Sequence, residues 1–204
     1  MENNLIKITI GLAITLASCS KEFELDKSVF IPDKDYPDLP AYTEWGYNTF
    51  GALYDRELFL YNDFSVPVKV INSGGKTSFT LKGHKGQSGT YYYNNDNSMS
   101  LNFDLYGFLP TTFSNLIELN DTIIDLTSPL CKVSLMVDTV KHQVTVLNGT
   151  LNFKRAQNLI VDRRQIEVIL SGTFEIQALI ENEPTSITAG RFDVGIGPDN
   201  FFKY

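Results

Sequence analysis

The sequence predicts an all-β protein, an antiparallel β-barrel or β-sandwich with little or no helix outside an N-terminal signal peptide. Residues 19–204 contain only five alanines, and Val, Ile, Thr, Tyr and Phe dominate the regular stretches, which favours strands over helices. Short apolar runs alternate with turns rich in Asn, Gly and Pro. Residues 110–120 are the one stretch that could hold a helical turn, so no strand–helix alternation is expected.

The composition is that of a folded protein with a single core. The chain has 204 residues, of which 43% are apolar and 20% charged, and its net charge is -7. A domain of this size buries about 70% of the surface that its unfolded chain exposes. Nucleic-acid binding depends on clustered Lys and Arg, so the acidic balance argues against a nucleic-acid partner.

The N-terminus has the pattern of a signal peptide. A short polar head precedes a nine-residue apolar run, residues 8–16. This run is too short to cross a bilayer, which takes about 20 apolar residues. The small residues Ala17 and Ser18 then lead to Cys19. We therefore expect residues 1–18 to be a cleaved signal peptide.

Leu16-Ala17-Ser18-Cys19 resembles the lipobox of bacterial lipoproteins. The resemblance implies that Cys19 is acylated, becomes the first residue of the mature chain and anchors it to a membrane. The alternative is plain secretion with an incidental cysteine. The following Lys21-Glu22 resembles the surface-export signal of Bacteroidetes lipoproteins. This implies an outer-membrane lipoprotein on the cell surface, or otherwise on the periplasmic leaflet.

Residues 19–41 are expected to form a lipidated tether. This segment is charged and contains Pro32, Pro37 and Pro40, which favour an extended chain. Residues 42–204 should then form a single β domain.

The clearest strand is the segment 165–178, in which apolar and polar residues alternate. Gly172 inside so long a strand indicates a bend or a β-bulge. The other expected strands are residues 58–61, 66–71, 77–81, 90–93, 98–103, 132–137, 143–147, 150–154, 187–189 and 191–194. Turns are expected at residues 72–75, 83–86, 94–97, 148–149 and 183–184.

Four pieces of the domain carry motifs: N-T-F-G within residues 43–52, the segment 149–154, S-G-T-F within 171–175 and G-R-F-D within 188–193. In this order they resemble a group of uncharacterised Bacteroidetes lipoproteins. The resemblance implies a small β-barrel or sandwich lipoprotein and carries no activity. The residue types in these motifs are typical of structural roles, such as turns, close strand contacts and core packing. Arg191 and Asp193, two residues apart, are expected to form an ion pair on one strand face.

No catalytic residue, metal site or cofactor site is predicted. His84 and His142 have no second ligand at metal-binding spacing, and neither stands near a nucleophile in a recognisable motif. Cys131 has no partner if Cys19 is acylated, and on an apolar strand it is expected to be a small buried side chain.

The best ligand-binding candidate is a run of three tyrosines followed by an amide-rich tip. Aromatic faces stack on the C–H patches of sugars, and Asn and Asp side chains bind hydroxyls. The alternative is a hairpin whose alternate tyrosines pack on the sheet. Trp45 is a further candidate, as a core residue or an exposed platform. The segment is Tyr91, Tyr92, Tyr93, Asn94, Asn95, Asp96 and Asn97.

Two short motifs, Asp121-Thr122-Ile123 and Asp138-Thr139-Val140, resemble the O-glycosylation acceptor of Bacteroidetes. The resemblance implies modification of Thr122 and Thr139, and chance occurrence is the alternative.

The leading hypothesis is therefore an outer-membrane-anchored lipoprotein acting as a non-catalytic binding or structural module. The alternative is a surface glycan-binding accessory protein of an uptake system, and an enzyme of unrecognised type is a third class. The expected partners are the membrane, through acylated Cys19, and either a glycan or a protein.

Overall fold

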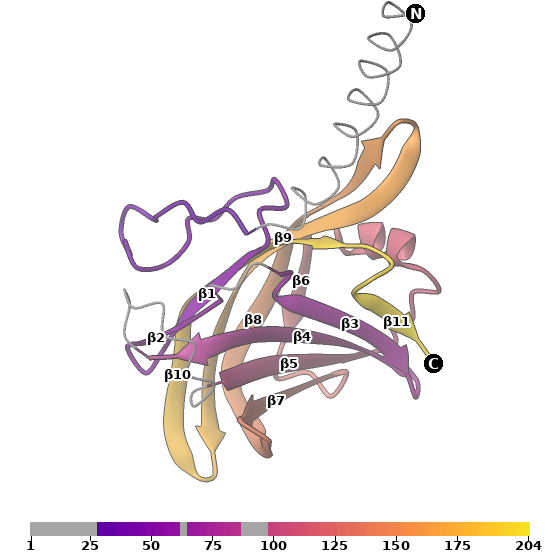
Figure 1. Cartoon of the computed structure of the whole chain (residues 1–204). Coiled ribbons are helices and arrows are strands. Elements are labelled where there is room, and N and C mark those ends of the chain that lie inside the picture. The colour runs from indigo at the N-terminus through magenta and orange to yellow at the C-terminus, as the bar shows by residue number, and fades with distance from the viewer. Residues whose placement is uncertain (1–27, 62–64, 87–97) are drawn as a thin grey trace, which may run out of the picture.

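The computed structural model describes residues 28–61, 65–86 and 98–204, and its strands belong to one sheet (Figure 1). This confirms the all-β prediction. One short 3₁₀ helix lies within the stretch where a helical turn was expected. The elements are β1 (Thr49–Tyr54), β2 (Glu57–Leu60), β3 (Val68–Ser73), β4 (Lys76–Lys85), β5 (Ser98–Tyr106), η3 (Phe113–Leu119), β6 (Thr122–Asp125), β7 (Cys131–Val137), β8 (Val140–Val161), β9 (Arg164–Ile180), β10 (Glu183–Ile196) and β11 (Phe201–Lys203).

The strand pairings close into a ring. Antiparallel pairs run in the order β4-β2-β1-β10-β9-β8-β7-β5, and β5 pairs again with β4. β3 pairs with β4 along the part of β4 that β2 does not cover, and β6 pairs with β8. Of the two arrangements left open by the sequence, the ring corresponds to the barrel. The sheet is mixed rather than purely antiparallel, because β11 pairs with β3 in parallel.

Two-residue loops join five of the hairpins. The last paired residues flank the loops 55–56, 74–75, 138–139, 162–163 and 181–182. Both residues of four of these loops have positive φ, as in the tight turns that match the twist of paired strands. Only the 74–75 loop is the Gly-Gly pair that a sequence search recognises easily.

Several expected turns are wrong because they lie inside long strands. Residues 148–149 belong to β8, where the register with β9 shifts between Val146 and Asn148. A Cβ on Gly149 would lie 2.6 Å from the carbonyl oxygen of Glu175. This glycine therefore serves close strand approach rather than a chain reversal. Residues 83–85 likewise continue β4, and 183–184 begin β10.

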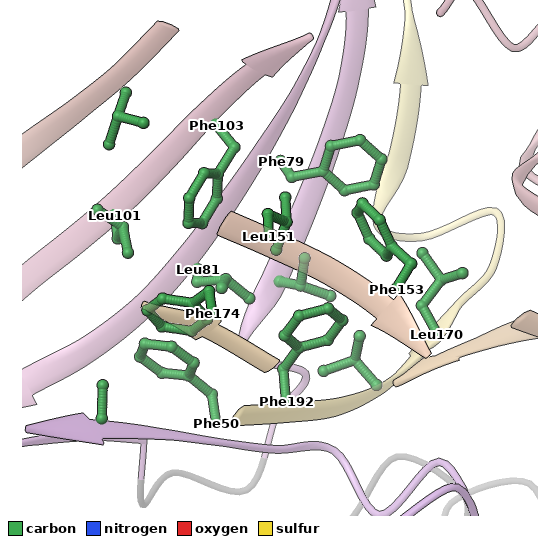
Figure 2. Close-up of a cluster of buried hydrophobic side chains, with 14 of the residues drawn as sticks. Phe50, Phe79, Leu81, Leu101, Phe103, Leu151, Phe153, Leu170, Phe174 and Phe192 are labelled. Atoms are coloured by element: carbon green, nitrogen blue, oxygen red, sulfur yellow. The ribbon is translucent and has the colours of Figure 1, made fainter. Parts of the chain in front are cut away.

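Phenylalanine side chains fill the interior of the closed sheet. Phe50 stacks on Phe174 with centroids 6.1 Å apart, and Phe103 meets Phe174 edge-on at 5.7 Å (Figure 2). Phe79 and Phe153, from β4 and β8, lie 5.5 Å apart. Each ring buried in this way contributes roughly 1.5–3 kcal/mol to the free energy of unfolding. Packing of these side chains across the interior of the closed sheet therefore supplies the main stabilisation of the fold.

Gly172 makes room for one of these rings. A Cβ at this position would lie 2.1 Å from the carbonyl oxygen of Asn152 and 2.6 Å from Cζ of Phe192. Opposite Gly172, the register of β8 shifts between Phe153 and Arg155. The expected irregularity at this glycine is thus present as a β-bulge in the partner strand.

The N-terminal strap, residues 28–41, packs on the domain, so these residues do not belong to the expected 19–41 tether. Leu39 is fully buried, and Pro32 forms an isolated bridge with Pro40. Pro40 lies so close to Gly51 that a Cβ there would approach its ring to 2.6 Å. Apolar burial of Leu39 is the physical reason that the segment folds back. The predicted domain boundary at residue 42 is therefore too late.

The expected ion pair between Arg191 and Asp193 does not form. The Arg191 guanidinium instead donates to the Asp33 carboxylate of the strap at 2.6 Å. Although burial opposes ionisation of Asp33, the backbone N–H groups of Tyr36 and Asp35, together with Arg191, hold its pKa below the usual value. The two strand residues therefore bind different parts of the N-terminal chain rather than each other.

We expect Gly172→Ala to destabilise the fold by about 2–3 kcal/mol, because the new methyl group would meet a backbone oxygen that cannot move freely. Urea unfolding measures this loss. Gln177→Ala, at an exposed position of the same strand, is the control and should change the free energy of unfolding by less than about 0.5 kcal/mol. Equal stability of the two variants would contradict the close packing described for β9.

Candidate functional site

The candidate site is built on the Trp45 loop, residues 42–47, which joins the N-terminal strap to β1. Trp45 is the only tryptophan of the chain and its side chain is 71% exposed. Of the two roles left open for this residue, the structure excludes the core. An exposed indole combines a large apolar face with one N–H donor, which suits it to contact a ligand or a partner.

The carboxylate of Asp193 fixes the Trp45 loop through four hydrogen bonds. Its side chain accepts hydrogen bonds from the Thr43 hydroxyl at 2.6 Å and from the N–H groups of Trp45, Gly46 and Tyr47 at 3.0, 2.8 and 3.2 Å. Asp193 itself is only 1% exposed. Hydrogen bonds to a buried charge are roughly twice as strong as those between neutral groups. The backbone that carries Trp45 is thus fixed by the sheet.

Local backbone geometry adds to this constraint. Gly46 has a φ of 74°, and a Cβ there would lie 3.1 Å from the Ile169 side chain of β9. Asn48 also has positive φ, at 53°, and its buried side-chain oxygen accepts the N–H of Gly195 at 3.0 Å. The N-T-F-G motif therefore begins with an asparagine that ties the loop to β10.

A surface hollow of about 410 Å³ lies beside the loop. We call it the Trp45 hollow. It is lined by Tyr42, Thr43, Glu44, Trp45, Arg155 and Gln157. An internal apolar void also exists among the core side chains, but its volume of about 10 Å³ is too small for a ligand. The Trp45 hollow is therefore the better candidate for binding.

The polar groups of the hollow form a connected network. The Tyr42 hydroxyl donates to the Glu44 carboxylate at 2.8 Å, and the Gln157 amide donates to the Glu44 carbonyl at 2.8 Å. Arg155 donates through Nε to Gln157 at 2.9 Å and lies 3.7 Å from the Glu44 carboxylate. Lys154 lies over the Tyr42 ring, 4.7 Å from its centroid. The network positions these polar side chains next to Trp45.

The Tyr42 phenol is the most perturbed group of the hollow. Burial raises its pKa to about 12, and the hydrogen bond and negative charge of Glu44 act in the same direction. Contact with the Ser171 hydroxyl acts the other way but is outweighed. Tyr42 is therefore a neutral hydrogen-bond donor at physiological pH, not a base.

The arrangement offers the groups that bind a polar ring. The hollow offers a flat aromatic face, a carboxylate, a guanidinium and an amide, which together stack on and hydrogen-bond a polar ring. Within the described ranges, no group of three or more His, Cys, Asp and Glu side chains could hold a metal ion. Cys131 is buried, as expected, and burial raises the pKa of its thiol to about 11.

Two of the other predicted sites cannot be placed relative to the Trp45 hollow, because Cys19 and the segment Tyr91–Asn97 lie outside the described residues.

The two threonines of the O-glycosylation motifs differ in accessibility. Thr139 is exposed in the two-residue turn between β7 and β8, whereas Thr122 is half-buried where β6 pairs with β8. Modification of either residue stays a prediction.

Most of the hollow could not be found from the sequence. Trp45 was a candidate, and Tyr42 and Glu44 are its close neighbours in the chain. Gln157, however, is separated by 113 residues from the carbonyl that it contacts. The alternation of Arg155 and Gln157 along β8 was an available signal, but nothing in it indicated the loop that these side chains contact.

None of the described helices is long and apolar enough to span a membrane. Comparisons of the chain with protein-family models, with curated proteins and with solved structures found no match.

We expect Asp193→Asn to loosen the Trp45 loop, because an amide cannot accept four hydrogen bonds as a carboxylate does. The free energy of unfolding should fall by about 2 kcal/mol. Acrylamide should also quench Trp45 fluorescence more strongly in this variant. The exposed Asp199→Asn is the control and should behave as the unmodified chain does. Unchanged stability and quenching in Asp193→Asn would refute the role assigned to this carboxylate.

The raised pKa of Tyr42 predicts a specific loss of stability at high pH. The unfolded chain loses this proton near pH 10, whereas the folded protein keeps it until about pH 12. The stabilisation is therefore complete below about pH 10 and is lost as pH rises through about 12. Between these values the free energy of unfolding should fall more steeply for the unmodified chain than for Tyr42→Phe. Parallel curves would show that Tyr42 is not perturbed.

Proposed function

We propose that this protein is an outer-membrane lipoprotein, anchored through acylated Cys19, whose β domain is a non-catalytic module that binds a sugar in the Trp45 hollow. The observation that carries the proposal is the 71% exposed ring of Trp45 on a loop fixed by Asp193. The lipobox resemblance supports the anchor, and the Lys-Glu sequence after Cys19 favours the cell surface.

The chemistry of the hollow fits a sugar better than an apolar ligand. An indole face stacks on the C–H patch of a pyranose ring, while Glu44, Arg155 and Gln157 supply an acceptor, a donor and an amide for hydroxyls. Since Glu44 and Arg155 lie close together with opposite charges, the hollow favours neutral sugars over strongly ionic ones. Preformed hydrogen bonds among these side chains reduce the entropy lost on binding.

The segment Tyr91–Asn97 is a second sugar-binding candidate in this proposal. Its aromatic and amide side chains offer the same chemistry as the Trp45 hollow, and it lies outside the described residues. Variants in the segment and in the hollow are therefore compared separately.

We expect Trp45→Ala to weaken sugar binding by roughly 1 kcal/mol or more while leaving stability nearly unchanged, because the ring is mostly exposed. A glycan array on the unmodified protein identifies the ligand, and calorimetry on the variant measures the loss. Tyr204→Ala, which removes another exposed aromatic ring, is the matched control and should bind normally.

Two outcomes separate the alternatives. If Tyr92→Ala weakens binding and Trp45→Ala does not, the ligand belongs to the Tyr91–Asn97 segment and the Trp45 hollow is not the site. If the protein binds no glycan, the proposed ligand class is wrong and a protein partner becomes the leading hypothesis.

A further inference from the structure

Beyond the ring, β8 and β9 continue as a projecting two-stranded arm, residues 157–167 (Figure 1). On one side, β6 pairs with β8 only as far as Phe153. On the other side, the pairing of β10 with β9 ends at Val168. The strands of the arm therefore pair with each other alone. A two-stranded ribbon of this kind is marginally stable in water by itself.

The tip of the arm is apolar and basic. Ile160 is 62% exposed and Val161 is 41% exposed. Asp162 and Arg163 form the tight turn, with φ values of 50° and 65°, and Arg164 follows. Two arginines thus stand at the tip against one carboxylate, in a chain whose net charge is -7. Ile160 and Val161 are consecutive residues on one strand and pair with Gln165 and Arg164, so the tip exposes an apolar side chain on each of its two faces beside the arginines.

The N-terminal strap begins beside the base of this arm. The Val29 N–H donates to the Tyr47 carbonyl at 2.8 Å, and in the same loop the Glu44 carbonyl accepts from Gln157 of the arm. Val29, Phe30 and Ile31 are each between 42% and 48% exposed. Only residues 20–27 lie between Cys19 and the strap, so the chain from Cys19 to residue 28 spans at most about 30 Å when fully extended. An acylated Cys19 would therefore hold this side of the domain close to the bilayer.

We propose that the arm rests on the membrane surface, with Ile160 and Val161 in the interfacial region and Arg163 and Arg164 on lipid phosphates. The inference rests on the proposed acylation of Cys19 and is independent of sugar binding. Arginine pairs well with phosphate oxygens, and β-branched side chains gain by leaving water. In an acidic chain, this basic tip is a surface that an anionic bilayer does not repel.

The arm also keeps the Trp45 hollow away from the lipid. Gln157 lies five residues before the turn, about 17 Å along an extended strand. With the tip on the membrane, a ligand in the hollow would sit above the headgroups. Thr139 lies in the turn at the opposite end of β8, which places that glycosylation candidate far from the bilayer.

The test uses the full mature protein, purified from membranes and reconstituted into anionic vesicles that contain brominated phospholipid. In a Trp45→Phe background, Ile160→Trp places a single fluorophore at the tip. Val140→Trp places it at the other end of the same strand, where the original side chain is similarly exposed at 57%. We expect the brominated lipid to quench most of the emission in the first variant and little in the second. Adding Arg163→Glu with Arg164→Glu should reduce the quenching in the first.

Vesicle flotation is scored before fluorescence. If the protein floats and the Ile160→Trp emission is quenched no more than the Val140→Trp emission, the arm does not touch the membrane and the inference is wrong. If no variant floats, Cys19 is not acylated, and the inference falls with the anchor. The failure of sugar binding alone would change neither readout.

Discussion

The buried carboxylate of Asp193 is the interaction on which the candidate site depends. This residue pairs in the sheet with Thr49 of β1 and Ser171 of β9, so its backbone belongs to the ring. Its side chain points to the outside of that ring and satisfies three backbone N–H groups and one hydroxyl of the Trp45 loop. A buried N–H left without a partner costs about 1–3 kcal/mol. Without the carboxylate, the loop could not keep its path, and Trp45 would lose its fixed position.

The G-R-F-D motif gains a physical explanation from this constraint. Phe174 packs so closely on Gly190 that a Cβ there would lie 2.6 Å from the ring, and Phe192 points into the core. Arg191 and Asp193 lie on the opposite face of β10, where one binds the strap through Asp33 and the other binds the Trp45 loop. Two residues thus fasten the strap and the Trp45 loop to a central strand. The motif is a structural one, and its effect on binding is indirect.

Patterns among neighbouring residues predicted most strands of the sheet. The errors arose where contacts between residues far apart in the sequence decide the structure. The alternation in residues 165–178 predicted β9, because one face of that strand packs in the core. Gly149 was misinterpreted as a turn, since a glycine needed for close strand approach gives the same local signal. The turn at Asp162 and Arg163 contains no glycine and was missed. Arg191 and Asp193 satisfied the spacing for an ion pair, but groups from the strap and loop, about 150 residues away, compete for both.

The sheet, through Asp193, fixes the backbone that presents Trp45, and hydrogen exchange of individual amides measures this constraint directly. We expect the N–H groups of Trp45, Gly46 and Tyr47 to exchange as slowly as the paired amides of β10, although they lie in a surface loop. Exchange of these three amides at the rate of unprotected loop residues would contradict the claim.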